Sequence, residues 1–359
     1  MSMMRAVESP PFKALHYLQQ ALLSPVLSGP LLLALVATPE SVRRAVLRRL
    51  SLPPTFDVGV AEAVLQVLLG LGLVRCVNNA LNSMAANCWR MRAAKGWDWP
   101  KEVAVVTGGC SGIGYGIVER LVRRQVKVAI LDIQDLPKSF EGHPHIRFYK
   151  CDITSPESVA EAADAVRRDL GHPSILINNA GITRPMSILK MPQDYLHKIF
   201  NVNCLSHWTT VQQFLPRMIQ LNKGHVVTVA SIASFVALAN AADYSATKAA
   251  AHSFHEALAT ELKQIYKADN VLTSVVHPYF VRTPLVEAYS DALEKKGMKL
   301  LTPEQVADAI AGQVFSRRGG QLILPDKKSL VSGFRGWPTW LQVLVRDAIG
   351  KSATSIEVH

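Results

Sequence analysis

The chain has 359 residues, of which 49% are hydrophobic and 19% charged, a composition that excludes an intrinsically disordered protein. Its 39 basic and 28 acidic side chains leave a net charge of +11, but no block of Lys and Arg is interleaved with aromatic residues, so nucleic-acid binding is not indicated. The five cysteines are spread without a CxxC pair, which argues for reduced thiols and against a metal site.

Two apolar stretches open the chain, residues 21–37, broken by proline and glycine, and residues 58–74, which contain Glu62. Both are shorter or more interrupted than the roughly 20 apolar residues of a transmembrane helix. The basic residues around them, which suit an anionic leaflet, are Arg43, Arg44, Arg48, Arg49, Arg75, Arg90, Arg92 and Lys95. We therefore expect residues 1–99 to form a helical membrane-associated extension, as an interfacial or re-entrant anchor or one span. The alternative is a helical lid packed on the rest of the chain.

From residue 101 to about residue 324, short β-branched runs alternate with longer helical patterns. The candidate strands are Glu102–Thr107, Lys127–Leu131, Ile146–Tyr149, Ser174–Asn178, His225–Ala230, Val271–Val276 and Gln321–Leu324. Nearly continuous apolar strands separated by helices are typical of a parallel sheet covered on both faces. The pattern predicts an α/β fold, with a single Rossmann-type, doubly wound domain over residues 100–326 and a seven-stranded parallel sheet.

A glycine-rich segment, "TGGCSGIG", follows the first candidate strand at residues 107–114. Glycines allow the backbone to approach a pyrophosphate, and the amino end of the following helix offers free N–H groups. Because the segment stands between a strand and the helical pattern "YGIVERLVRRQ", it predicts a dinucleotide site. The residues expected to hold the cofactor there are Thr107, Gly108, Ser111, Gly112, Ile113 and Gly114.

An acidic residue, Asp132, ends the second candidate strand, eighteen residues after Gly114. This is near the spacing at which an acid binds the ribose hydroxyls of a dinucleotide. Its negative charge would repel the additional phosphate of NADP, so NAD is favoured and NADP is not excluded. The alternative is an ordinary turn residue after a strand.

The segment "YSATK" places Tyr244 and Lys248 four residues apart, on one face of a predicted helix. A neighbouring ammonium group favours the phenolate and is therefore expected to lower the pKa of the tyrosine. The spacing alone is common and does not identify an enzyme.

The C-terminal residues 327–359 contain "GWPTWLQVLVRDAIG". Its apolar residues step by three and four, which predicts an amphipathic helix. The residues of this face are Trp337, Trp340, Leu341, Leu344, Val345, Ala348 and Ile349. Either a membrane interface or the protein itself would cover such a face.

An ordered set of motifs resembles the classical short-chain dehydrogenase/reductase family over about residues 101–326. The set comprises TGxxxGIG, Asp152 in "CDIT", "NNAG" at residues 178–181, Asn203 in "NVN", Ser231, and the pair Tyr244 and Lys248. The resemblance implies an oxidoreductase that uses NAD or NADP.

For the cofactor, the resemblance implies that Asp152 contacts the adenine and that Asn179 and Gly181 shape the pocket. Thr283 would bind the nicotinamide carboxamide. One position departs from the family: in "HPYFVRTPL" Tyr279 stands where a glycine is common. A bulky side chain there is expected to narrow or reshape the substrate pocket.

For catalysis, the resemblance implies that Ser231 hydrogen-bonds the substrate oxygen and that Tyr244 transfers the proton. Lys248 would bind the nicotinamide ribose and tune Tyr244, while Asn203 would hold a water that links Lys248 to solvent. The covering segment over the substrate is expected at residues 286–301.

The apolar extension running into "KGWDWPKEVAVVTGG" resembles the membrane-associated branch that includes retinol and 17β-hydroxysteroid dehydrogenases. This implies a small lipophilic secondary or allylic primary alcohol, or its carbonyl compound, as substrate. It also implies a membrane or lipid-droplet surface as partner, at the endoplasmic reticulum or a lipid droplet, with the catalytic domain in the cytosol. A polyketide or terpenoid alcohol fits equally well. A non-catalytic lipid-surface binding protein and an extended-type epimerase remain alternatives, and a homodimer is implied by family analogy.

Overall fold

The computed structural model describes residues 21–49, 57–295, 298–325 and 330–353. The chain divides into two compact units between Ala85 and Ala86. The sequence boundary expected at residues 326–327 lies outside the described residues.

The first unit consists of α3 (Pro25–Ala37), α4 (Glu40–Arg49) and α5 (Val58–Ala86). The start of α3 approaches α5 at Gly72, where an added Cβ would lie 2.7 Å from the carbonyl oxygen of Leu23. The helix α5 has 29 residues, a mean hydropathy of 1.9 over its most apolar window, and 6% of that window buried. By length and composition α5 is long enough to cross a membrane, which corrects the expectation that this stretch is too short. The helix continues beyond residue 74 because alanine, leucine and methionine, all good helix formers, follow.

The second unit is built on a sheet of seven parallel strands in the order β3-β2-β1-β4-β5-β6-β7. The strands are β1 (Val103–Thr107), β2 (Lys127–Asp132), β3 (Ile146–Lys150), β4 (Ile175–Asn178), β5 (Gly224–Val229), β6 (Val271–Pro278) and β7 (Gly320–Leu324). This confirms the predicted doubly wound sheet, with strand ends displaced by no more than two residues.

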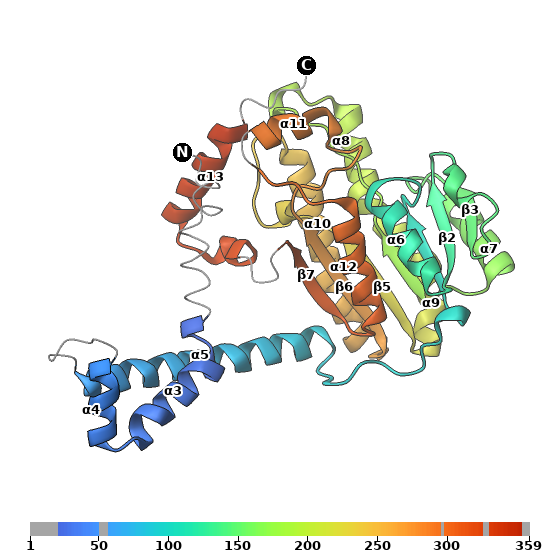
Figure 1. Cartoon of the computed structure of the whole chain (residues 1–359). Coiled ribbons are helices and arrows are strands. Elements are labelled where there is room, and N and C mark those ends of the chain that lie inside the picture. Colours follow the sequence, from blue (N-terminus) through green and yellow to red (C-terminus); the bar gives the residue numbers. More distant parts are fainter. Residues whose placement is uncertain (1–20, 50–56, 296–297, 326–329, 354–359) are drawn as a thin grey trace. The chain divides into compact units, whose positions relative to one another are not determined.

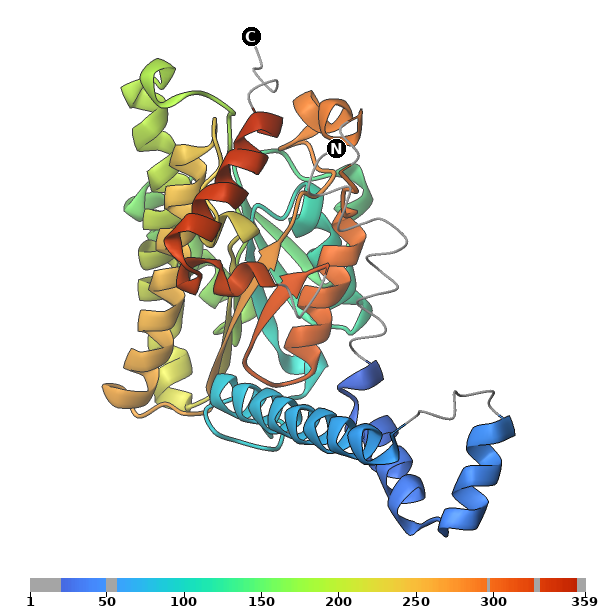
Figure 2. The same cartoon turned by 90° about the vertical axis from the view of Figure 1, so that its left-hand side faces the viewer.

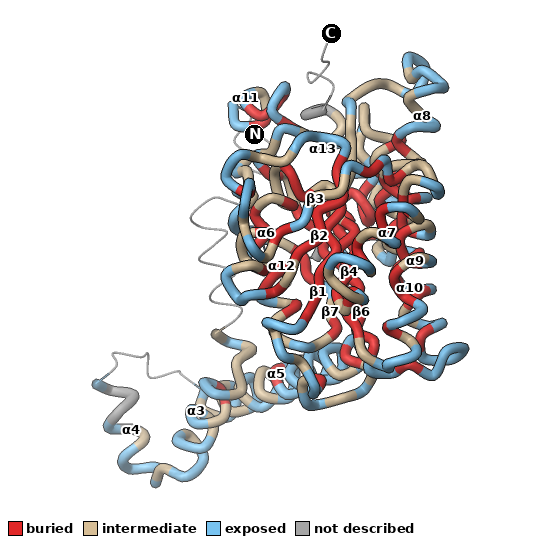
Figure 3. The backbone as a smooth tube through the Cα atoms, turned by 90° about the vertical axis from the view of Figure 1, so that its right-hand side faces the viewer, coloured by how far each residue is buried: buried red, intermediate tan, exposed pale blue. Residues whose placement is uncertain are grey.

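Helices cover both faces of the sheet (Figure 1). The described helices of this unit are α6 (Gly112–Arg123), α7 (Pro156–Leu170), α8 (Gln193–Phe200), α9 (Ser206–Leu221), α10 (Ala242–Gln264), α11 (Glu287–Lys295), α12 (Pro303–Phe315) and α13 (Thr339–Ala353). The side chains of α6 and α12 pack on one face, whereas those of α7, α9 and α10 pack on the other. Figure 3 shows the buried strands between helices whose outer sides are exposed. Parallel strands buried on both faces explain the long β-branched runs in the sequence.

The helix α12 begins at a capping box. Thr302 accepts a hydrogen bond from the backbone N–H of Gln305, whose side chain accepts one from the backbone of Thr302. The loops after β1, β2, β5 and β6 all lie at the carboxyl edge of the sheet, because the strands are parallel. The predicted cofactor and catalytic residues therefore gather at this edge.

The apolar residues predicted to share one face at α13 are partly packed and partly exposed. Trp337 and Val345 pack against a buried cluster that contains Phe235 and Phe334. Trp340 and Leu344 are 66% and 57% exposed. Side chains of Ala348 and Ile349 are outside the described part of the chain. The helix is drawn in red in Figure 2, and its membrane role stays a prediction.

Candidate active site

The glycine-rich turn between β1 and α6 has no room for side chains at its key positions. Gly108 and Gly112 have φ angles of +65° and +54°, in the left-handed region that favours glycine. A Cβ on Gly114 would lie 2.0 Å from the carbonyl oxygen of Gly108. The turn is therefore the kind of close backbone cradle that a pyrophosphate requires, and it fits a dinucleotide.

Thr107 and Asn179 hold this turn in place. The Thr107 hydroxyl accepts a hydrogen bond from the backbone N–H of Asn179 at 3.0 Å, and the Asn179 amide donates to the carbonyl oxygens of Thr107 and Gly108 at 3.0 and 3.1 Å. Asn179 thus shapes the proposed pocket by fixing the backbone of the glycine-rich turn.

The other residues predicted around the turn divide into two groups. Ser111 is the N-cap residue of α6 without a side-chain capping bond, and Ile113 packs on the core. Thr283, which is distant in sequence, lies against the turn, because a Cβ on Gly112 would be 3.3 Å from its methyl carbon. The structure therefore brings Thr283 to the turn.

Asp132 ends β2 beside the glycine-rich turn and is 6% exposed. Its two carboxylate oxygens accept hydrogen bonds from the backbone N–H groups of Cys110, at 2.9 Å, and Gln134, at 3.0 Å. The carboxylate therefore ties the turn to the end of β2, at the place where a dinucleotide ribose is expected.

Asp152 lies after β3 and is exposed. One carboxylate oxygen accepts hydrogen bonds from the backbone N–H of Thr154 at 2.9 Å and from its hydroxyl at 2.7 Å. These bonds form a local turn before α7, which is a structural role for the carboxylate. Its contact with adenine stays a prediction.

The predicted catalytic residues converge at the start of α10. Lys248 is 4% exposed, donates to the carbonyl oxygen of Val229 at 2.9 Å, and lies 5.7 Å from the centre of the Tyr244 ring. Ser231 follows β5, and its hydroxyl lies close enough to the Tyr244 phenol to lower the pKa of that group. Gly181 lies beside Lys248, because its added Cβ would be 3.5 Å from the Lys248 amine.

The protonation equilibria differ from the expectation that Lys248 lowers the pKa of Tyr244. Burial raises the pKa of Tyr244, and the hydrogen bond from Ser231 offsets only part of this effect. Burial also lowers the pKa of Lys248 to about 8. Desolvation, which the sequence pattern does not report, outweighs the attraction between the two groups. The phenol is therefore held in its protonated form.

Asn203 lies in a π-helical turn, Asn201–Leu205, between α8 and α9. Its side-chain oxygen accepts from the backbone N–H of Ile182 at 2.8 Å, and its amide donates to the carbonyl of Ile182 and to Thr247. The side chain thus fixes the segment after Gly181 against α10. The predicted water at Asn203 stays a prediction.

The sequence reasoning missed His277, the residue before Pro278 at the end of β6. Its Nδ1 lies 3.0 Å from the carbonyl oxygen of Ser231, and its Nε2 lies 3.2 Å from the side-chain nitrogen of Gln321 on β7. A buried strand ending in a polar residue beside the predicted site was the available signal.

Tyr279 follows β6 and is partly buried, and its effect on a substrate pocket stays a prediction. Its backbone N–H donates to the carbonyl of Leu324, and its ring packs on two core clusters and against the Phe280 ring, at 5.1 Å between centroids. The aromatic side chain therefore contributes to the core beside β7. The backbone does not adopt a positive φ there, so it has no need of glycine.

The comparisons with known proteins agree with this geometry. The family described as short chain dehydrogenase matches residues 102–294, more than half of the chain. Dehydrogenase RED2 of Cochliobolus heterostrophus is 42% identical over 180 residues, covering 50% of this chain and 68% of the relative. Retinol dehydrogenase 10-A of Danio rerio is 33% identical over 234 residues, covering 55% of this chain and 68% of that protein.

Short-chain dehydrogenase/reductase family 16C member 6 of Bos taurus is 31% identical over 224 residues, covering 60% of this chain and 70% of that protein. Among solved structures, the aldohexose dehydrogenase of Thermoplasma acidophilum aligns with a TM-score of 0.53 and 25% identity, covering 62% of this chain and 92% of that one. With its seven-stranded parallel sheet and glycine-rich turn, this chain belongs to the short-chain dehydrogenase family and is an oxidoreductase acting on CH–OH groups.

Proposed function

We propose that the protein interconverts a lipophilic secondary or allylic primary alcohol and its carbonyl compound with NAD, at a membrane surface. The observation that carries the proposal is the convergence of Ser231, Tyr244 and Lys248 beside the glycine-rich turn. A nicotinamide dinucleotide bound along this edge supplies the hydride donor or acceptor.

The chain's own residues supply the rest of the chemistry. The Ser231 hydroxyl orients the substrate oxygen, and Tyr244 gives or takes its proton. Burial raises the pKa of Tyr244 and so keeps the phenol protonated, which is the form that donates to a substrate oxygen. Lys248, fixed by Val229, holds a positive charge near the phenol below a pH of about 8.

Asp132 supports NAD as the cofactor. The carboxylate lies at the end of β2 and accepts hydrogen bonds from Cys110 and Gln134, which keeps it beside the turn. A negative charge held there opposes the extra phosphate of NADP. The ribose hydroxyls of NAD would instead donate to its remaining lone pairs.

Two features support a lipophilic substrate. The segment after β6 forms an apolar cluster that contains Val286, Tyr289 and Leu293. Burial raises the pKa of Tyr289. Tyr289 also lies close enough to Tyr244 for the charge of the Tyr244 phenolate to raise it further. In addition, one of the relatives above is named retinol dehydrogenase 10-A. These favour a substrate pocket with an apolar cover.

The first unit supports membrane association. Along α5, the side chains of Val60, Val64, Val67, Leu71 and Val74 are more than half exposed, and they repeat at steps of three and four residues. Exposed apolar surface of this extent is a membrane or partner site in most proteins. We propose the endoplasmic reticulum or a lipid droplet as its location, with the catalytic unit in the cytosol and a homodimer as the working form.

A substrate screen tests the proposal. Purified full-length protein would be given NAD and a panel of retinoids, steroids and long-chain secondary alcohols, with NADH fluorescence as the readout. Tyr244→Phe is the matched control, because it keeps the ring and removes only the proton carrier. We expect NADH formation with at least one lipophilic alcohol and at least a hundredfold lower rate in the variant. Turnover that survives Tyr244→Phe, or no turnover with any alcohol or with NADH and the matching carbonyls, would overturn it.

A further inference from the structure

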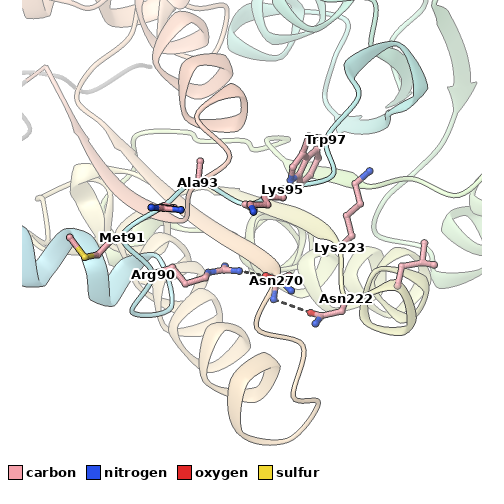
Figure 4. A pocket seen from close by; sticks show the side chains of 11 residues that line it. Arg90, Met91, Ala93, Lys95, Trp97, Asn222, Lys223 and Asn270 are labelled. Carbon is pink, nitrogen blue, oxygen red and sulfur yellow. Dashed lines mark hydrogen bonds between the residues drawn. The ribbon is translucent and has the colours of Figure 1, made fainter.

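A basic cavity lies at the amino edge of the sheet, opposite the candidate active site. Its volume is about 730 Å³, and this open cavity is lined by the linker after α5, the loop before β5 and the loop before β6. Figure 4 shows Arg90, Asn270 and Asn222 joined in a row by hydrogen bonds, with Lys95 and Trp97 above them in the view. All its lining residues belong to the second unit.

The charge of this cavity is positive and largely uncompensated. Four basic residues line it, Arg90, Arg92, Lys95 and Lys223, and of the described residues that line it none is acidic. Lys223 pairs with the buried carboxylate of Glu102 at 2.6 Å. Within the described ranges neither Arg92 nor Lys95 has an acidic side chain within ion-pair distance, and both are exposed. About three positive charges therefore remain to attract an anion.

One donor in the cavity has no partner. The guanidinium of Arg90 donates to Asn270 and to the carbonyl oxygen of Asn87, but its Nη2 is buried without a hydrogen-bond partner among the described residues. The charge of this partly buried guanidinium adds to the positive potential that attracts an anion to the cavity.

The linker that carries these residues is fixed to the catalytic unit. The Asn87 amide donates to the carbonyl oxygens of Arg90 and Arg92 at 2.7 and 3.1 Å, and its oxygen accepts from the backbone of Gly319 at 3.2 Å. The backbone of Ala94 donates to Arg317 at 2.9 Å. The cavity is therefore a built feature of the fold.

The rim of the cavity is apolar, and this favours a lipid over a soluble anion as the ligand. Met91 and Leu221 line it and are 74% and 55% exposed, and Trp89 beside them is 55% exposed. Trp97 lies under the Lys223 amine, 5.2 Å from ring centre to nitrogen. Exposed tryptophan, methionine and leucine next to arginine and lysine are typical of surfaces that sit at the headgroup layer of a bilayer.

The position of the cavity in the chain supports the same ligand. Arg90 follows the end of α5 by four residues, so its Cα is within about 14 Å of that helix end, whatever the arrangement of the two units. We propose that the cavity binds the phosphate headgroup of an anionic phospholipid, with Met91, Leu221 and Trp89 entering the layer around it. This inference rests on the proposed membrane association and names the lipid that the catalytic unit recognises.

The test uses the full-length protein in a neutral detergent, where insertion of α5 into a bilayer plays no part. Dioctanoyl phosphatidylserine, dioctanoyl phosphatidylcholine and inorganic phosphate would each be titrated calorimetrically. The charge variant is Arg92→Gln with Lys95→Gln, since both side chains are exposed. The matched control is Lys138→Gln with Lys198→Gln, two exposed lysines after β2 and in α8.

We expect phosphatidylserine to bind at least tenfold more tightly than phosphatidylcholine. An exposed ion pair contributes up to about 1 kcal/mol, or about fivefold in affinity, so the charge variant should bind phosphatidylserine up to roughly 20-fold more weakly, while the control keeps the preference. Met91→Ser with Leu221→Ser should weaken both lipids and leave inorganic phosphate unaffected.

Three results would overturn the proposal: equal affinity for the two lipids, a preference that survives in the charge variant, or inorganic phosphate binding as tightly as phosphatidylserine. The last would mark a site for a soluble anion. Alcohol oxidation measured on the same samples keeps the two proposals distinct, because the lipid preference does not require turnover. A protein that selects phosphatidylserine but oxidises no alcohol would fail only the proposed function.

Discussion

His277 holds the backbone of Ser231 through a hydrogen bond of 3.0 Å between its Nδ1 and the Ser231 carbonyl oxygen. Burial lowers the pKa of His277 to about 3, so the ring is neutral at physiological pH. Gln321 can donate to the other ring nitrogen, at 3.2 Å, which leaves the proton on Nδ1. The last two strands of the sheet thus position the serine of the proposed active site.

Replacing His277 by phenylalanine is expected to lower kcat by about 10- to 100-fold, since small displacements of a positioning group are costly. The KM for NAD should change little, because no residue of the glycine-rich turn takes part in this bond. His277→Asn, which offers an amide donor, should restore part of the rate. Steady-state kinetics on the three proteins checks this. Equal losses in both variants would mean that the ring matters for packing alone.

Lys248→Met is expected to remove activity and raise stability together. Burial lowers the pKa of Lys248 from 10.5 to about 8, a shift equivalent to about 3 kcal/mol. Below pH 8 the folded protein carries this cost, and as pH rises from about 8 to 10.5 the unfolded chain binds more protons, so stability increases. At pH 7 the variant should gain about 2 kcal/mol in the free energy of unfolding, after loss of the bond to Val229. Urea denaturation at pH 7 and 10 measures it, and a gain that is the same at both pH values would contradict the assigned cause.

Asp132→Asn is expected to change the cofactor preference with little change in fold. The amide oxygen keeps an acceptor for one of the two backbone N–H groups, of Cys110 or Gln134, while the other loses its acceptor to the amide NH2 and the charge is removed. We predict that kcat/KM for NADP rises about tenfold relative to that for NAD, the effect of one nearby charge in a partly hydrated site. An unchanged ratio of the two values would place the ribose contact elsewhere.

Acid is expected to unfold the second unit through buried histidines. Burial lowers the pKa values of His207, His225, His255 and His277 to about 3 from 6.5. Between pH 6.5 and about 3 the unfolded chain binds protons that the folded chain does not, so stability falls as pH falls, by about 1.4 kcal/mol per pH unit for each histidine. The urea midpoint should therefore drop steeply between pH 6.5 and 5. His225→Gln should flatten that slope, whereas an unchanged slope would assign the acid sensitivity to other groups.

Periodicity was sufficient to predict the sheet, because each strand is buried on both faces and therefore reads as a continuous β-branched run. The glycine spacing likewise predicted a turn in which a side chain at Gly114 would collide with the carbonyl oxygen of Gly108. Two features lie beyond such patterns. The pKa of Tyr244 depends on its burial, and the packing of Tyr279 depends on β7, which is distant in sequence. Each is set by tertiary contacts or solvation, which a local pattern does not contain.

The linker from α5 enters the second unit at the amino edge of the sheet, whereas the glycine-rich turn and Tyr244 lie at the carboxyl edge. The eight residues of β6 span this distance, about 26 Å. If the amino edge rests on headgroups, the reacting carbon of an alcohol must travel that far from the bilayer. Desorption into water would then govern turnover, and within a homologous series the rate should fall as the hydrocarbon chain becomes longer and leaves the lipid more slowly.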